Sequence, residues 1–236
     1  MSHDLLRGDH HVHSTFSDDA VSTLEENVAA AAERGLTTLR LVDHVRSDTA
    51  WVPEYLAAVR GLQVPDGLTV LTGVEAKILD VSGELDIPVL PPGIDRILIA
   101  DHQFPGDDGP LGPTAVRERI AAGWATDDVL DQLVTALNAS MTRYPGNQLA
   151  HCFSILPKIG LVKDDLGPER IASWARTAAE TDTLVEVNEK WGCPGGALLD
   201  ALRDAGAVVV ASTDSHEASD VGRYDRVVAL LDGRSL

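Results

Sequence analysis

The sequence predicts an α/β protein in which short strands alternate with longer helices. Two observations carry this prediction: β-branched runs recur along the 236 residues, and helical patterns separate them. Strands that keep alternating with helices pair in parallel, which leaves either a barrel or a doubly wound sheet. Because a chain of this length commonly folds as one unit, we expect a single domain over residues 1–236.

The expected strands are short runs rich in β-branched and apolar residues, each bounded by turn-forming residues. These runs cover residues 8–13, 38–43, 69–75, 96–101, 148–152, 184–188 and 207–213.

The expected helices fill the intervals between these strands. The first has a capping signature, because Ser22 or Thr23 precedes Glu25 and Glu26, and Gly35 follows its end. The helical patterns cover residues 23–34, 53–61, 127–144, 168–181, 195–205 and 218–223.

Two stretches, 79–93 and 105–113, are rich in Pro, Gly and Asp and are expected to be long loops. A loop of this length is either a surface insertion or a mobile lid over a site, and the sequence favours the insertion.

The composition is acidic, with a formal net charge of −18. Such a surface repels a phosphate backbone, so a dedicated nucleic-acid binder is not expected unless bound cations change the local field. No apolar run is long enough to span a membrane, and the first nine residues lack the apolar core of a signal peptide. Two cysteines are too few for a disulfide framework, which predicts a cytoplasmic protein.

Three histidines lie together in the stretch "DHHVHS". His11 and His13 are two residues apart on an expected strand and should face one side, whereas His10 should face the helices. Asp9 shares the inward parity and is expected to support a ligand. Cys152, next to His151, should face outward as a small buried apolar residue.

Six of the eight histidines lie at or just beyond the carboxyl end of an expected strand. In parallel sheets and barrels this end is where active sites are assembled. Imidazole and carboxylate groups without cysteine suit Zn²⁺, Mn²⁺ or Fe²⁺, and nine candidates are enough for two or three ions. The candidate ligands are His11, His13, Asp18, His44, Glu75, His102, His151, Asp214 and His216.

The ordered set of motifs "DHHVHSTFSDD", "LVDH", "GVEAKILDVSGELDIP", "ILIADH", "LAH" and "STDSHEASDVG" resembles the PHP (polymerase and histidinol phosphatase) family of metal-dependent phosphoesterases. The resemblance implies a distorted seven-stranded, TIM-like (β/α)7 barrel. It also implies up to three divalent ions, held by three groups of residues: His11, His13, Glu75 and Asp214; Glu75, His102 and His151; and Asp18, His44 and His216. Asp19 lies beside Asp18, and family members place this ligand at either spacing.

The expected reaction is hydrolysis of a small phosphomonoester by a metal-bridged hydroxide, with the ions neutralising the phosphoryl oxygens. Glu75, Asp214 and His216 are the expected catalytic residues. Basic side chains near the strand ends are candidates to bind the substrate phosphate: Arg46, Lys77, Lys158, Lys190 and Arg223. Asn188 is a candidate to orient water or substrate, and Trp51 and Trp191 either line a pocket or pack in the core.

Several alternatives remain open at this point. Nuclease and histidinol-phosphatase activities belong to the same family chemistry, and the net charge argues against the nuclease. An amidohydrolase also begins with His-x-His on its first strand, but that fold typically has a modified lysine on the fourth strand. The fourth expected strand here, "RILIADH", has no lysine. A metal-binding module without activity is the non-enzymatic alternative. We expect such a protein to lack one or more ligands, whereas this chain has all nine candidates.

Overall fold

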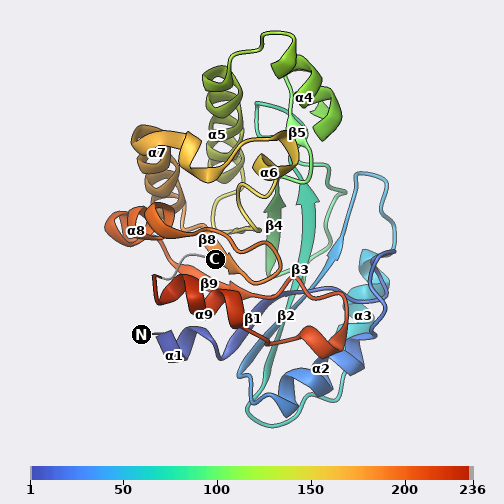
Figure 1. Cartoon of the computed structure of the whole chain (residues 1–236). Coiled ribbons are helices and arrows are strands. Elements are labelled where there is room, and N and C mark those ends of the chain that lie inside the picture. Colours follow the sequence, from blue (N-terminus) through green and yellow to red (C-terminus); the bar gives the residue numbers. More distant parts are fainter. Residues whose placement is uncertain (1, 234–236) are drawn as a thin grey trace.

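A computed structural model describes residues 2–233 of the chain. In this part of the chain, seven parallel strands form one sheet in the order β1-β2-β3-β4-β7-β8-β9 (Figure 1). The bounds are β1 Gly8–Val12, β2 Thr38–His44, β3 Thr69–Lys77, β4 Arg96–Ala100, β7 Gln148–Leu149, β8 Leu184–Asn188 and β9 Val209–Ser212.

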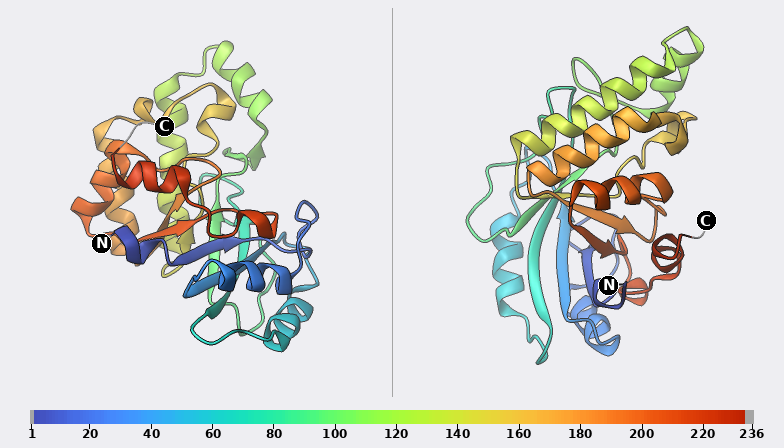
Figure 2. Two further views of the ribbon diagram at one scale, coloured as in Figure 1. Left: turned by 60° about the horizontal axis from the view of Figure 1, so that its bottom comes forward. Right: turned by 90° about the vertical axis from the view of Figure 1, so that its left-hand side faces the viewer.

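The sheet curls until its first and last strands meet. Val12 at the end of β1 bridges to Ser215 after β9, and the His13 amide donates to the Ser215 carbonyl at 2.8 Å. The seven strands thus form a nearly closed barrel with helices outside it (Figure 2). This confirms the predicted distorted α/β barrel and excludes the doubly wound sheet.

The helices expected between strands are present with small shifts at their ends. The cap of the first is the predicted box, because Thr23 Oγ1 accepts from the Glu26 amide while Glu26 accepts from the Thr23 amide. These helices are α2 Leu24–Glu33, α3 Val52–Gly61, α5 Thr126–Arg143, α7 Gly167–Glu180 and α8 Gly196–Ala205. The helix expected over 218–223, after the last strand, is only a short 3₁₀ turn, η2 Ala218–Asp220.

Other elements were not expected from the sequence. A two-stranded hairpin of β5 and β6 lies in the segment predicted to be a loop, and short helices and turns lie between the main elements. They are α1 Ser2–Leu5, β5 Phe104–Pro105, β6 Pro110–Leu111, α4 Pro113–Ala121, α6 Leu156–Ile159, η1 Lys163–Leu166 and α9 Asp225–Leu231.

The first strand contains an irregularity that corrects two expectations. The β1–β2 register shifts between Asp9 and Val12, and a bulge there turns two successive side chains to one side. His10 therefore faces the barrel interior with His11, where burial, with a smaller effect from the charge of Arg40, lowers the pKa of His10 to about 4. Asp9 instead faces outward, where its carboxylate accepts from Thr213 and from the Gly222 amide.

The fifth strand of the barrel is shorter than predicted. β7 ends at Leu149, and His151 has a positive φ of 22°, so the chain leaves the strand direction before Cys152. Cys152 is buried in the core under the helices, as predicted, and Cys193 is also buried.

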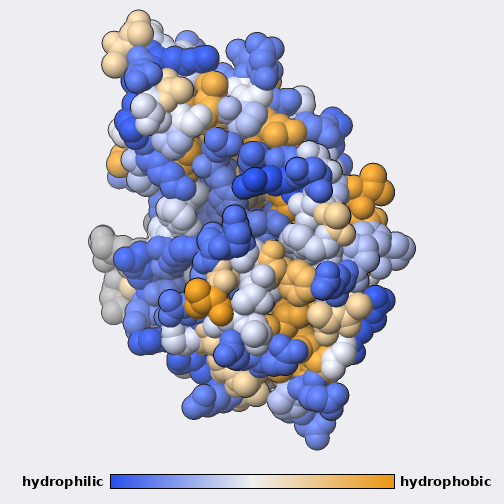
Figure 3. Space-filling view, turned by 90° about the vertical axis from the view of Figure 1, so that its right-hand side faces the viewer, coloured by the Kyte–Doolittle hydropathy of each residue, from blue (hydrophilic) through white to orange (hydrophobic). Residues whose placement is uncertain are grey.

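The main core lies between the outer face of the barrel and the helices, with Tyr55, Phe153 and Trp174 among its largest buried side chains. A much smaller apolar cluster of Val42, Leu98, Ala100 and Ala150 fills part of the interior. Hydrophilic residues cover much of the face in Figure 3, with apolar residues among them. Residues 2–233 contain no helix long and apolar enough to cross a membrane.

The 79–93 segment packs against the helix layer. Leu85 is 3% exposed, and a Cβ on Gly83 would lie 2.3 Å from the Ser140 amide nitrogen of α5. Only glycine allows this approach, because Gly83 also has a φ of +77°. The segment fits the description of a packed insertion better than that of a free lid.

Replacing Leu137 of α5, which is 0% exposed, with alanine should lower the free energy of unfolding by about 2–5 kcal/mol, because it leaves a cavity in the main core. Urea denaturation measures the change. Val89→Ala, at a side chain that is 100% exposed, should change stability by less than about 0.5 kcal/mol. Equal effects of the two substitutions would contradict this placement of the core.

Candidate metal centre

Eight of the nine predicted ligands lie together at the carboxyl end of the barrel. His11 and His13 come from the end of β1, and His44 and Glu75 are paired across the β2–β3 ladder. The remaining four lie on the loops that follow β4, β7 and β9. Parallel strands place all these carboxyl ends at one mouth, so residues far apart in sequence meet there.

Glu75 lies at the middle of this group, and its side chain is 0% exposed. Five imidazoles surround the carboxylate, three at Oε2 and two at Oε1. The Oε2 distances are 2.9 Å to His44 Nδ1, 3.4 Å to His11 Nε2 and 3.5 Å to His13 Nε2. The Oε1 distances are 2.8 Å to His151 Nε2 and 3.1 Å to His102 Nε2.

Asp214 supplies a second buried carboxylate. Its Oδ1 is 3.2 Å from His13 Nε2 and 3.8 Å from His11 Nε2. The residue has a positive φ of 55°, which an aspartate tolerates better than most residues. The turn at this position points the carboxylate toward β1.

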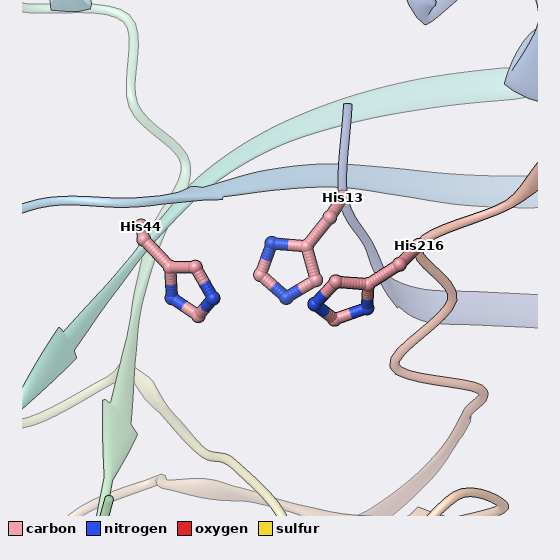
Figure 4. A group of neighbouring side chains, drawn as sticks. All are labelled: His13, His44 and His216. Atoms are coloured by element: carbon pink, nitrogen blue, oxygen red, sulfur yellow. The ribbon is translucent and has the colours of Figure 1, made fainter. Parts of the chain in front are cut away.

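At the open side of the centre, His13, His44 and His216 point toward one another (Figure 4). Asp19 approaches the same three-histidine group, with Oδ2 3.2 Å from His216 Nε2 and 3.5 Å from His44 Nε2. Both aspartates are exposed, the Asp19 side chain by 54%, but within the described residues only Asp19 has a contact with these histidines. We therefore propose Asp19, rather than Asp18, as the candidate ligand, because its carboxylate lies nearer His44 and His216.

The donors suit divalent cations. Four overlapping groups of three His, Asp or Glu side chains each bring their ligand atoms within 4.8 Å of one another. The His11 and His13 Nε2 atoms are only 3.0 Å apart, and Glu75 Oε2 is buried without a hydrogen-bond partner of good geometry. Nitrogen and carboxylate oxygen atoms that converge in this way are a ligand set for Zn²⁺, Mn²⁺ or Fe²⁺.

Within the centre, the buried carboxylates and the imidazoles shift each other's pKa values. Burial alone would raise the pKa of Glu75, but His102, His11 and His44 hold it well below the usual range. Burial would lower the pKa of His11, but the carboxylates of Glu186, Glu75 and Asp214 raise it well above the usual value. Protons on the imidazoles therefore compete with metal for the same nitrogen atoms.

Buried aspartates on the outer side of the strands hold the loops that carry the ligands. Asp9 accepts from Thr213 Oγ1 at 2.6 Å and from the His11 amide at 3.4 Å. It thus supports a ligand as expected, although from the opposite side of the strand.

Asp43, which precedes His44, accepts from Ser14 Oγ and Ser17 Oγ at 2.7 Å each, and Ser17 Oγ accepts from the His44 amide at 2.9 Å. Asp101, which precedes His102, accepts from Ser154 Oγ at 2.8 Å. Burial raises the pKa of Asp43 to about 6, and the hydrogen bonds from Ser14 and Ser17 oppose that rise.

The predicted phosphate-binding residues differ in how close they lie to the centre. Lys190 Nζ is 3.5 Å from Asp214 Oδ2 and 3.2 Å from His216 Nδ1. It lines, with Arg223 and Arg226, a hollow of about 550 Å³ that reaches Asp214 and His216.

The other three predicted residues have separate positions. Lys158 Nζ lies over the ring of Trp191, 4.2 Å from its centroid, and Trp191 itself flanks His151 with the ring centroids 5.7 Å apart. Lys77 pairs with Asp86 at 3.4 Å, and Arg46 is exposed beside Thr49. Trp51 packs against Phe16 and Tyr55, as a core residue would.

The sequence prediction missed Glu186 on β8 entirely. This fully buried carboxylate accepts from His11 Nδ1 at 2.9 Å. It lies within β8 rather than after the end of a strand, and it is not part of a His-x-His or Asp-x-His pattern. Its inward parity within β8 was the one available signal.

Comparison with known proteins gives results of two kinds. The family model described as PHP domain matches residues 9–190. A probable phosphatase from Enterobacter sp. strain 638 is 29% identical, covering 95% of this chain and 84% of that protein. A probable phosphatase from Aeromonas salmonicida is 27% identical, covering 94% of this chain and 83% of that protein.

Among solved structures, the fold is similar to that of histidinol phosphate phosphatase from Lactococcus lactis, which was crystallised with zinc, L-histidinol and phosphate. The TM-score is 0.66 at 16% sequence identity, covering 95% of this chain and 92% of that one.

Asp19→Asn should reduce the metal bound per chain after dialysis, because it removes the negative charge that lies beside both His44 and His216. Elemental analysis measures the metal. Asp18→Asn is the matched control and should retain the metal content of the unaltered protein. A larger loss in Asp18→Asn would return Asp18 to the ligand set.

The stabilisation that added Zn²⁺ gives should grow as pH rises from 6 to 8. Without metal, nearby carboxylates raise the pKa of His11, His44 and His151 despite burial, so their protonated pairs stabilise the fold at low pH and lose that effect as pH rises. Zn²⁺ binds deprotonated imidazoles, so its affinity rises as pH rises. Thermal unfolding with and without Zn²⁺ measures the difference in Tm, and a difference independent of pH would contradict this account.

Proposed function

The chain belongs to the PHP domain family, and we propose that it is a metal-dependent phosphatase whose substrate is a small phosphomonoester. The observation that carries the proposal is the Glu75-centred cluster, in which five histidines surround one buried carboxylate. Phosphoester hydrolysis at such a centre requires no serine or cysteine nucleophile.

The donors fit two or three divalent ions of zinc, manganese or iron. His11, His13 and Asp214, with Glu75, would hold one ion, and Glu75 with His102 and His151 would hold a second. Asp19, His44 and His216 would hold a third, near His13. Bound ions would supply activation of water and neutralisation of phosphoryl charge.

The chain's own residues bind and orient the substrate. Glu75, Asp214 and His216 are the proposed catalytic residues, because the first two carboxylates face the centre and His216 lies where the centre meets the hollow. Lys190 and Arg223 line that hollow, which supports their proposed role in binding phosphate oxygens. Lys158, Lys77 and Arg46 remain candidates for the outer part of the substrate.

The size and charge of the site favour a small substrate. The hollow of about 550 Å³ also contains Glu189, Glu217 and Asp220, and the whole chain carries a net charge of −18. A nucleic acid would bring many phosphates against this surface, whereas a single phosphate needs only the few cations beside the centre. A histidinol-phosphatase activity remains an alternative within the same chemistry, and the fold of the Lactococcus lactis enzyme is compatible with it.

We also propose that the protein acts in the cytoplasm. Both cysteines are free thiols and buried, which suits a reducing compartment.

Zn²⁺- or Mn²⁺-loaded protein should hydrolyse members of a panel of phosphomonoesters, and chelation should abolish this activity. His13→Ala should lower kcat/KM by about 10³-fold or more, because His13 contacts both buried carboxylates. Released phosphate measures turnover, with single-stranded and duplex DNA as the test for nuclease activity. Turnover that survives both chelation and His13→Ala would contradict the proposal, and faster cleavage of DNA than of every phosphomonoester would replace it with the nuclease.

A further inference from the structure

Strand β8 and the loop after it supply no candidate ligand, yet they contact ligands from both ends of the chain. Glu186 accepts from His11 Nδ1 at 2.9 Å. This bond leaves His11 Nε2 free to point at Glu75 and His13. Glu186 thereby fixes which nitrogen of His11 is presented to a metal ion.

Four further donors hold Glu186 itself, so the carboxylate has little freedom to move. One oxygen also accepts from Gln148 Nε2 at 2.7 Å. The other accepts from Ser212 Oγ and Asn188 Nδ2 at 2.9 Å each and from the His151 amide at 3.1 Å. The residue is 0% exposed. A charge buried this deeply persists only with such a complete set of donors.

Trp191 orients Asp214 through a hydrogen bond, as Glu186 orients His11. The indole Nε1 donates to Asp214 Oδ2 at 2.8 Å. With Oδ2 held in this way, Oδ1 is the oxygen that faces His13, at 3.2 Å. Lys190 Nζ, 3.5 Å from Oδ2, adds a charge on the same outer side.

Asn188 joins these two contacts. Its Nδ2 donates to Glu186 Oε2 at 2.9 Å, and its Oδ1 accepts from the Trp191 amide at 3.0 Å. The Asn188 amide also donates to the Cys193 carbonyl at 2.7 Å, which closes the loop that carries Trp191. Asn188 was a candidate to orient water or substrate, but both ends of its side-chain amide are already used.

A continuous hydrogen-bonded path thus runs from His11 through Glu186, Asn188 and Trp191 to Asp214. From this path we infer that Glu186 and Trp191 are positioning residues that hold His11 and Asp214 in the orientation and separation that metal binding requires, with Asn188 coupling the two. The inference rests on the proposed metal centre.

The primary test is Trp191→Phe, which keeps an aromatic ring beside His151 and removes only the donor to Asp214. The side chain is half-buried at the mouth, so the substitution spares the core. We expect about tenfold or greater weakening of Zn²⁺ affinity, measured by competition with a chromophoric chelator. The Tm of the metal-free protein should remain close to that of the unaltered protein.

Trp124→Phe is the matched control. Trp124 is also half-buried, packs on Phe104 and has Arg119 near its ring, as Trp191 has Lys158. Its Zn²⁺ affinity should stay unchanged. Addition of Zn²⁺ should alter tryptophan fluorescence in the unaltered protein and in Trp124→Phe, and much less in Trp191→Phe.

A double-mutant cycle tests the coupling. Glu186→Gln keeps the side-chain shape but replaces one accepting oxygen with a donor. If the path acts as a unit, Glu186→Gln and Trp191→Phe together should weaken Zn²⁺ affinity by less than the product of the two single effects. Independent effects that multiply would overturn the role of Asn188.

An unchanged Zn²⁺ affinity in Trp191→Phe, or an equal loss in Trp124→Phe, would overturn the inference. Failure of the proposed function gives a different result. In that case the unaltered protein would bind no more Zn²⁺ than His13→Ala does.

Discussion

A carboxylate buried among imidazoles is the constraint on which the rest of this structure depends. Glu75 is 1% exposed as a residue, and burying its charge costs several kcal/mol unless opposite charges or metal ions compensate. The compensation comes from five histidines on four strands or strand ends. The barrel must therefore fix the register of those strands. The parallel β2–β3 ladder, for example, pairs His44 directly with Glu75.

Outside the barrel, the same arrangement supports two of the ligand loops. Asp43 and Asp101 directly precede His44 and His102, so strand alternation sends the acid outward where the histidine goes inward. Each acid then binds the hydroxyl groups of a loop that carries other ligands, Ser14 and Ser17 in one case and Ser154 in the other. The ligands are thus held by loops that are themselves hydrogen-bonded to the scaffold, which limits how far the empty site can relax.

The residue pattern predicted the alternating α/β elements and most of the cluster, because most of the histidines lie at or just beyond strand ends. The choice of a barrel over a doubly wound sheet came from the family resemblance. The sequence was insufficient where backbone detail decides the direction of a side chain. A bulge in β1 reverses the parity assigned to Asp9 and His10, and the loop after β1 brings Asp19, rather than its neighbour Asp18, beside His44 and His216. Glu186 could not be found by motif, since its role depends on donors from β1, β7, the turn after β7 and β9, together with Asn188 on its own strand.

The closure between β1 and the segment after β9 has a consequence for how the protein acquires activity during synthesis. His13 lies on the first strand of the barrel and Asp214 after the last, and the hydrogen bond from the His13 amide to Ser215 joins these two parts of the chain. A nascent chain that has emerged only through β8 holds most of the imidazoles but lacks Asp214 and His216. The candidate ligand set is therefore complete only after residues 214 and 216 have been synthesised, and its assembly depends on contacts of long sequence separation.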